Sequence, residues 1–121
     1  MNREQGSVSI VVAALVAMIL VLGLGAADLA KALVAVSRAQ SAADAAALAA
    51  AQELALPSGR EPSDAAAEYA SLNGGELVEC RCEAGTLEAT VQVRVPVGYL
   101  STLGGERNVE AQARAIVDLG G

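Results

Sequence analysis

The residues best suited to chemistry in this chain are its two cysteines, Cys80 and Cys82, which are separated by Arg81 alone. On an extended strand both side chains point to one face, about 6.6 Å apart along the backbone, at the upper edge of disulfide geometry. Three states stay open: a buried reduced pair, a strained or intermolecular disulfide in an oxidising compartment, and a catalytic dithiol. The dithiol ranks last, because the pair has neither a histidine base nor a helix N-terminus beside it.

Other chemistry finds little support in the sequence. A structural zinc site normally takes four Cys or His ligands, and this chain has two Cys and no His, so zinc would need ligands from a partner. No GxxxxGK loop, HExxH motif, nucleophile with a His partner or metal-spaced carboxylate cluster is present. We therefore expect no enzymatic activity, no metal and no cofactor.

Composition limits what the chain can build. Its 121 residues, with the apolar N-terminal run set aside, leave room for one small domain. The aromatic residues are two Tyr, so the core must be packed from small aliphatic side chains. The formal charge of −6 comes from 14 acidic and 8 basic residues without a basic block, which argues against a nucleic-acid or anionic-lipid surface.

The strongest signal is an apolar run over residues 8–27, in which Ser9 is the only polar side chain. As a helix it matches a hydrocarbon core about 30 Å thick. A secretory signal cleaved between Ala27 and Asp28 is the competing interpretation. We favour retention, because the run is longer than a signal core and helical patterning continues to Leu56. Flanking charges do not decide the orientation, but the short N-terminus favours an extracytoplasmic C-terminal head.

Two stripes on this helix are candidates for packing. The first is a ridge of small residues inside the apolar run, which allows close helix contact or simply faces lipid: Ser9, Ala13, Ala17 and Gly25. The second is a seam with alternating spacings of four and three residues: Leu29, Leu33, Val36, Gln40, Ala43, Ala47, Ala50 and Leu54. The seam needs a partner, either the protein's own sheet or a neighbouring subunit. Gln40 and Asp44 stand one turn apart, either hydrogen-bonded or separately solvated.

The rest of the chain predicts a small α+β head. Residues 56–64 contain two prolines and a glycine and form the linker. A second helix begins near Pro62, ends at Asn73-Gly74-Gly75 and has an apolar side of Ala66, Tyr69, Ala70 and Leu72.

Three antiparallel strands follow. Residues 86–95 alternate strictly and form a half-buried strand that Pro96 ends. A turn over residues 83–86 joins it to an earlier strand with Val78, Cys80 and Cys82 on one face. A loop through residues 103–105 leads to a third strand over about residues 108–118. The inner positions of that strand are Val109, Ala111, Ala113, Ala115 and Val117. The predicted organisation is a tail and transmembrane helix (1–27), a helical stem (28–56) and a head (57–121), with helices covering one face of the sheet.

Two motifs carry a family resemblance: Gln5-Gly6-Ser7-Val8 before the apolar run, and RAQSAADAAALAAA over residues 38–51. With them the chain resembles TadE/TadG-like pilus-assembly proteins, specifically the small TadE-like proteins encoded beside secretion ATPase genes in high-GC Gram-positive bacteria. The cysteine-containing strand, the alternating valine strand and the ARA-containing last strand also look like that group. The resemblance implies a single-pass pseudopilin-like or accessory subunit of a tight-adherence (Flp-type) pilus, a pilin-like lollipop in shape.

The same resemblance raises a second cut point. Substrates of prepilin peptidases usually have Gly at the cut and Glu five residues beyond it; Gly6 fits, but the fifth residue is Val11. The protein is therefore either processed between Gly6 and Ser7 or kept as a full-length anchor. Its expected partners are membrane lipid and other pilin-like or secretion-platform subunits, in a homo- or hetero-oligomer and without nucleic acid. The alternative function is a secreted binding or effector protein released after Ala27.

Overall fold

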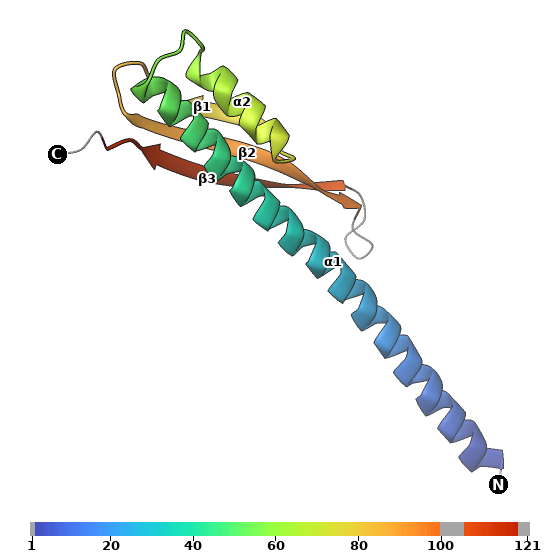
Figure 1. Cartoon of the computed structure of the whole chain (residues 1–121). Helices are drawn as coiled ribbons and strands as arrows, with labels where there is room; N and C mark the ends of the chain where they lie inside the picture. Colours follow the sequence, from blue (N-terminus) through green and yellow to red (C-terminus); the bar gives the residue numbers. More distant parts are fainter. Residues whose placement is uncertain (1, 100–105, 119–121) are drawn as a thin grey trace.

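One helix, α1 (Asn2–Ala55), runs through almost half of the chain without a break. In the computed structural model, which describes residues 2–99 and 106–118, it is followed by α2 (Pro62–Leu72), β1 (Glu76–Arg81), β2 (Glu88–Tyr99) and β3 (Glu106–Ile116). The first half of α1 projects alone, and its second half lies along the head (Figure 1). The α+β class and the order of elements predicted from the sequence are confirmed.

The length of α1 follows from its composition, because no proline occurs before Pro57 and strong helix formers fill the segment after Asp28. Its 54 residues extend for about 80 Å. At the end of the helix the backbone N–H of Ser58 donates to the Glu53 carboxylate over 3.2 Å, and the Ser58 hydroxyl donates to it over 2.7 Å. These bonds hold the linker in the turn that brings α2 back along α1.

Helix α2 ends as predicted, with a left-handed glycine. Gly74 has φ +81°, its N–H donates to the carbonyl of Ser71, and the N–H of Gly75 donates to that of Ala70. This pair of bonds satisfies carbonyls that the helix end would leave open. The chain then passes close to the core: a Cβ at Gly75 would lie 2.5 Å from Cγ1 of Val93 and 3.0 Å from Cβ of Ala42.

The apolar side predicted for α2 is partly wrong. Its buried residues are Ala65, Ala66 and Ala70, whereas Tyr69 is 45% exposed and Leu72 is 72% exposed. Small side chains face α1 because the two helices approach closely, and the larger ones project outward. The alanines therefore define the packed face of this helix.

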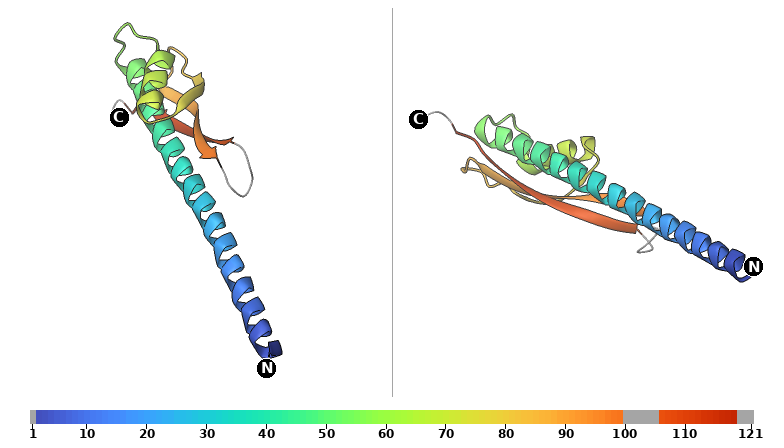
Figure 2. Two further views of the ribbon diagram at one scale, coloured as in Figure 1. Left: turned by 90° about the vertical axis from the view of Figure 1, so that its right-hand side faces the viewer. Right: turned by 90° about the horizontal axis from the view of Figure 1, so that it is seen from below.

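The sheet has the order β1-β2-β3 with antiparallel neighbours, and α1 and α2 cover one face of it (Figure 2). The turn between β1 and β2 is closed by Thr86, whose N–H and hydroxyl both donate to the carbonyl of Glu83. Strand β3 begins two residues earlier than predicted and pairs with β2 over its whole length. The predicted loop through residues 103–105 lies outside the described residues.

Two details of the predicted strands are wrong, and both concern irregular pairing. In β1 the register shifts between Leu77 and Glu79, so Val78 is 42% exposed and Leu77 packs on the core in its place. Pro96 does not end β2, which continues to Tyr99 past a second register shift between Pro96 and Gly98. Pairing with β1 ends at Arg94, so Pro96 lies where β2 has become an edge strand and lacks no required donor.

The core is built from alanine and valine. Val91, Val93 and Val95 of β2 are its largest fully buried side chains. They pack with Ala113 of β3 and against a face of α1 made entirely of alanines: Ala35, Ala39, Ala42, Ala43, Ala46, Ala47, Ala50 and Ala51. The predicted inner residues of β3 all belong to this core or pack against it. Alanine allows the helix to approach the sheet closely, which places the outer half of α1 inside the head.

Candidate functional site: an exposed apolar neck on the long helix

Four large apolar side chains lie exposed on α1 between the apolar run and the head; Val34 lines a groove beside the sheet, and the other three lie on the predicted seam. Leu29 is 60% exposed, Leu33 is 61% exposed and Val36 is 51% exposed. We call these three residues the neck face. They follow directly on residues 8–27, whose apolar side chains are also exposed, so the neck face extends an apolar surface beyond the length that a bilayer core would cover.

The predicted seam on α1 divides at this point. Its distal residues Ala43, Ala47 and Ala50 are buried and Leu54 packs on the core, so the protein's own head covers that half. The proximal half is not covered, because the buried stripe there consists of Ala35 and Ala39, one position before Val36 and Gln40. One residue is about 100° around a helix, so the proximal seam points away from the sheet. Gln40 donates from Nε2 to Oδ1 of Asp44 over 3.0 Å, so the two residues are hydrogen-bonded and not separately solvated.

The small-residue ridge lies below the neck face. Ser9, Ala13 and Ala17 are exposed, and Gly25 is partly covered. Among the described residues, α1 from residue 6 onward is the helix that has the length and apolar composition needed to cross a membrane. Both the ridge and the neck face are accessible in this fold. Contact of either surface with another helix stays a prediction.

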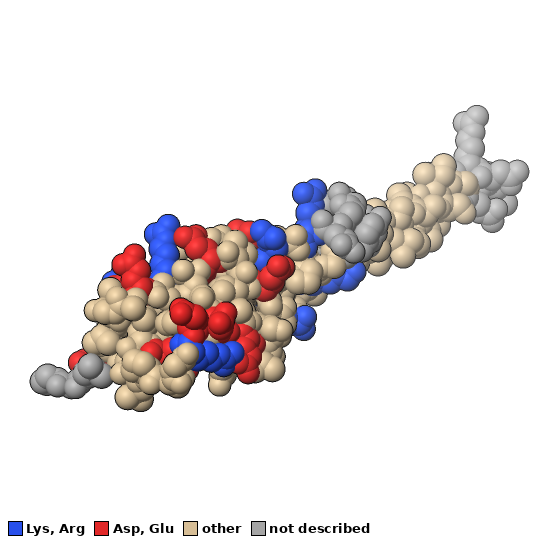
Figure 3. Space-filling model, turned by 90° about the horizontal axis from the view of Figure 1, so that it is seen from above, with Lys and Arg blue, Asp and Glu red and all other residues tan. Residues whose placement is uncertain are grey.

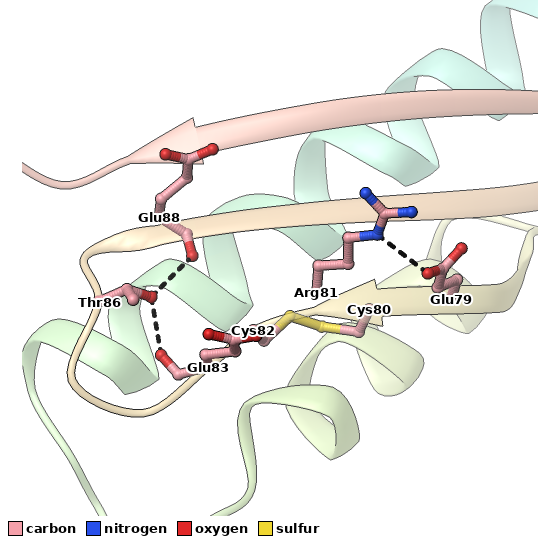
Figure 4. The surroundings of a disulfide bond; sticks show 7 residues. All are labelled: Glu79, Cys80, Arg81, Cys82, Glu83, Thr86 and Glu88. Carbon is pink, nitrogen blue, oxygen red and sulfur yellow. Dashed lines mark hydrogen bonds and ion pairs between the residues drawn. A yellow bond between two sulfur atoms is a disulfide. The ribbon is translucent and has the colours of Figure 1, made fainter.

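The cysteine pair lies at the end of β1 beside the turn (Figure 4). A disulfide joins Cys80 and Cys82, whose Cα atoms are 5.5 Å apart. Both side chains pack against the core, while Arg81 points to the other face and donates to Glu79 over 3.1 Å. The disulfide therefore lies at the C-terminal end of the short edge strand β1, next to the turn into β2.

We expect the disulfide to be present in the mature protein. The unreduced, denatured chain should then gain no mass with an alkylating reagent, and should gain two adducts after reduction. Adducts on the unreduced chain would contradict the disulfide, and the Cys80→Ser variant, with one thiol in both conditions, calibrates the measurement. A loop this short contributes about 1.5 kcal/mol through the unfolded state, so reduction should loosen β1 without unfolding the head.

Two further features concern binding. Within residues 2–99 and 106–118, no group of three or more His, Cys, Asp or Glu side chains is arranged to hold a metal ion.

A groove of about 290 Å³ lies where the sheet meets α1, lined by Ala30, Lys31, Val34, Ala35, Arg38, Pro96 and Val97. Sequence patterns could not indicate this groove, because it joins segments about 60 residues apart.

Comparison with known proteins finds a match for α1, the helix that carries the small-residue ridge and the neck face. Residues 6–53 match the family model described as putative Flp pilus-assembly TadE/G-like. The long helix is TadE/G-like. No curated protein and no solved structure matches the chain.

The TadE/G-like segment coincides with one structural element. It begins four residues after the start of α1 and ends two residues before its end, so it contains the apolar run, the neck face and the alanine surface, but neither α2 nor the sheet. The match supports involvement in Flp pilus assembly, in a family of structural and accessory proteins. With the apolar helix, it also fits a membrane-anchored protein.

Both predicted cut points fall inside the TadE/G-like helix. Gly6 and Ser7 lie in its first turns, and Ala27 and Asp28 lie at its middle without a break in the helix. Asp28 is 6% exposed, the one buried charged side chain among the described residues. The use of either cut point remains a prediction.

Proposed function

We propose that the protein is a single-pass, pseudopilin-like or accessory subunit in the assembly of a tight-adherence (Flp-type) pilus or a related secretion system. Residues 8–27 anchor it, the head lies on the extracytoplasmic side, and the neck face contacts the helix of a neighbouring subunit. The observation that carries the proposal is the exposure of Leu29, Leu33 and Val36 within the segment that matches the TadE/G-like family.

The energetics favour a contact at the neck face. Complete burial of a Leu or Val side chain stabilises by about 1.5 to 3 kcal/mol, and three such side chains lie within two turns of helix. Neighbouring subunits in the same membrane present their helices in parallel and at the same height. A modest apolar surface is therefore sufficient for association, since the bilayer already fixes the orientation.

The alternative, a secreted protein that begins at Asp28, is less consistent with this surface. The head core begins at Ala35, so it would survive such a cut. The released protein would, however, carry the neck face at its free end in water, an exposed apolar patch of the kind that marks interaction sites or causes aggregation. We therefore propose that the helix is retained.

Two exposed leucines of α1 allow a matched test of the neck face. Leu33→Asn should lower the amount of other pilus-assembly subunits that co-purify with the tagged, cross-linked full chain by about tenfold, which corresponds to 1.4 kcal/mol. Leu48→Asn changes a leucine that is 55% exposed on the distal part of the same helix and should have little effect. Equal yields from the two variants, or recovery of the protein as a lone monomer from piliated cells, would contradict the proposal.

N-terminal sequencing of the protein from native membranes separates the three possible mature forms. A start at Met1 indicates a full-length anchor, and a start at Ser7 indicates a processed, pilin-like subunit. A start at Asp28 would overturn the membrane-anchored function and leave the secreted alternative.

A further inference from the structure

The spacing of the neck face continues down α1 into the apolar run. From Leu29 toward the N-terminus, alternating steps of three and four residues meet an aliphatic side chain each time. Toward the head, the same steps pass Leu33 and Val36 and reach Gln40. We call these positions the heptad stripe: Val8, Val12, Leu15, Ile19, Leu22, Ala26, Leu29, Leu33, Val36 and Gln40. All ten residues are exposed, and the stripe is about 48 Å long.

The heptad stripe is the one helical stripe of residues 8–40 that large aliphatic side chains fill almost throughout. The stripes beside it are interrupted by Gly23 or Gly25, which have no side chain to pack. The stripes on the opposite side of the helix reach Asp28, Lys31 or Arg38. Charged side chains gather on the head and where the helix meets it, and the described part of the projecting helix is uncharged on the face shown (Figure 3). An apolar surface therefore runs unbroken from the membrane span to Val36.

The residue types in the heptad stripe indicate a parallel pair of helices. Two of its a positions hold the β-branched residues Val12 and Ile19. The d positions between and after them hold Leu15, Leu22 and Leu29. β-Branched residues at a with leucine at d favour two parallel strands, and helix pairs in membranes commonly use the same left-handed packing. Such a stripe fits a second copy of itself in register, because each position then faces its own counterpart.

The head determines where the heptad stripe ends. The next two positions in the spacing, Ala43 and Ala47, are buried under the protein's own head. Gln40 occupies the last exposed position and is oriented by its hydrogen bond to Asp44. A polar residue at a single a position selects one register at some cost in stability. Two straight helices that cross at about 20° in the middle of the stripe diverge toward this end, which leaves space for two heads.

We propose that the protein forms a parallel homodimer along the heptad stripe, with both copies anchored in the same membrane. The apolar runs contact each other inside the bilayer, and each neck face contacts the neck face of the second copy. Outside the bilayer, burial of Leu29, Leu33 and Val36 adds hydrophobic stabilisation that the lipid-embedded part lacks, since lipid tails are as apolar as leucine. The inference rests on the anchored state in the proposed function and names a second copy as the partner at the neck face. Other pilus subunits then meet this dimer, so Leu33→Asn still lowers their recovery.

Two leucines of the apolar run allow a matched test in a bilayer. Leu22 belongs to the heptad stripe and is 65% exposed, whereas Leu20 is 63% exposed and lies about 200° around the helix from it. The full chain, labelled at its N-terminus with a donor or an acceptor dye, should show energy transfer in phosphatidylcholine vesicles, and its dependence on the protein-to-lipid ratio gives the dissociation constant of the dimer. Leu22→Ala should raise this constant by about tenfold, because each dimer loses two packed leucine side chains. Leu20→Ala should change it by less than about twofold, because Leu20 faces lipid.

Cysteine cross-linking tests the part of the stripe outside the bilayer. Leu33→Cys and Val34→Cys add a thiol at adjacent residues that are 61% and 55% exposed. Under mild oxidation, Leu33→Cys should give a disulfide-linked dimer on a non-reducing gel, because equivalent stripe positions face each other. Val34→Cys points away from the second copy and should remain largely monomeric.

The outcomes separate the homodimer from the proposed function. A native chain that stays monomeric in the vesicles, or equal dissociation constants for Leu22→Ala and Leu20→Ala, overturns the homodimer and leaves the anchored function intact. Equal cross-linking of Leu33→Cys and Val34→Cys does the same. A dimer that forms as expected, together with unchanged recovery of pilus subunits by Leu33→Asn, supports the homodimer and overturns the role in a pilus. A mature protein that begins at Asp28 overturns both.

Discussion

Val93→Asp should unfold the head while the apolar part of α1 stays helical in detergent. Val93 is fully buried at the middle of β2, with Leu77 and Ala111 as its strand partners and Gly75 packed against its side chain. An uncompensated carboxylate in this position costs several kcal/mol. Small domains are stable by only about 5 to 15 kcal/mol and commonly lie near the lower limit. Amide exchange in β2 and β3 should rise to unprotected rates, with little change over residues 8–27.

A position of the same strand that faces the other way, Thr90, provides the control. Thr90 lies on the face away from the helices and pairs with Arg81 and Arg114, so an aspartate there meets cations and water. Thr90→Asp should change the free energy of unfolding by less than about 0.5 kcal/mol. Similar exchange in the two variants would mean that the sheet does not bury the valine face of β2 against α1.

The fold was predictable from the sequence wherever one periodicity dominates a long segment. The absence of proline before Pro57 and of glycine between Gly25 and Pro57 predicted α1, and the strict alternation from Thr86 to Val95 predicted β2 and its buried face. The Gly74 ending of α2 follows from the left-handed conformation that glycine favours. In each case the local preference of the residues, for helix, strand or turn, agrees with the place that the packed fold gives them.

The errors arose where packing or pairing decides between local alternatives. Hydrophobicity suggested Tyr69 and Leu72 as the packed side of α2, but the short distance between the helices admits only alanine there. A single extra residue in β1 exchanged the positions of Val78 and Leu77, and no local sequence pattern marks such a bulge. Pro96 was compatible with β2 because β1 is too short to pair with it, a fact about a distant strand.

The neck face was predictable only in part, again because packing decides between local alternatives. The spacing of Leu29, Leu33 and Val36 identified an apolar seam, but an alanine-rich helix offers several such stripes. Only the fold shows that the head occupies the stripe of Ala35 and Ala39 and leaves the other exposed. The groove beside the neck face was beyond sequence analysis, because its lining residues on α1 and β2 are about 60 positions apart and meet only when β2 returns to α1.

The close approach of the helices makes alanine at their contact a strict requirement, and Ala66→Leu should therefore destabilise the head by about 1 to 3 kcal/mol. Ala66 is fully buried in the cluster that joins α2 to α1 and the sheet. Three added carbon atoms have no space there unless α2 moves outward, which would separate its alanines from those of α1. The midpoint of urea unfolding, followed by amide exchange in α2 and β1, should fall accordingly.

Ala67 makes the test specific, because it is the next residue of the same helix and is exposed. Ala67→Leu adds the same atoms and has nearly the same helix propensity, so it should shift the unfolding midpoint very little. A loss confined to Ala66→Leu shows that spacing between the helices, rather than helix formation, limits the stability of the head. Equal losses in both variants would instead indicate that α2 tolerates leucine poorly at any position, and the close-packed alanine contact would then be wrong.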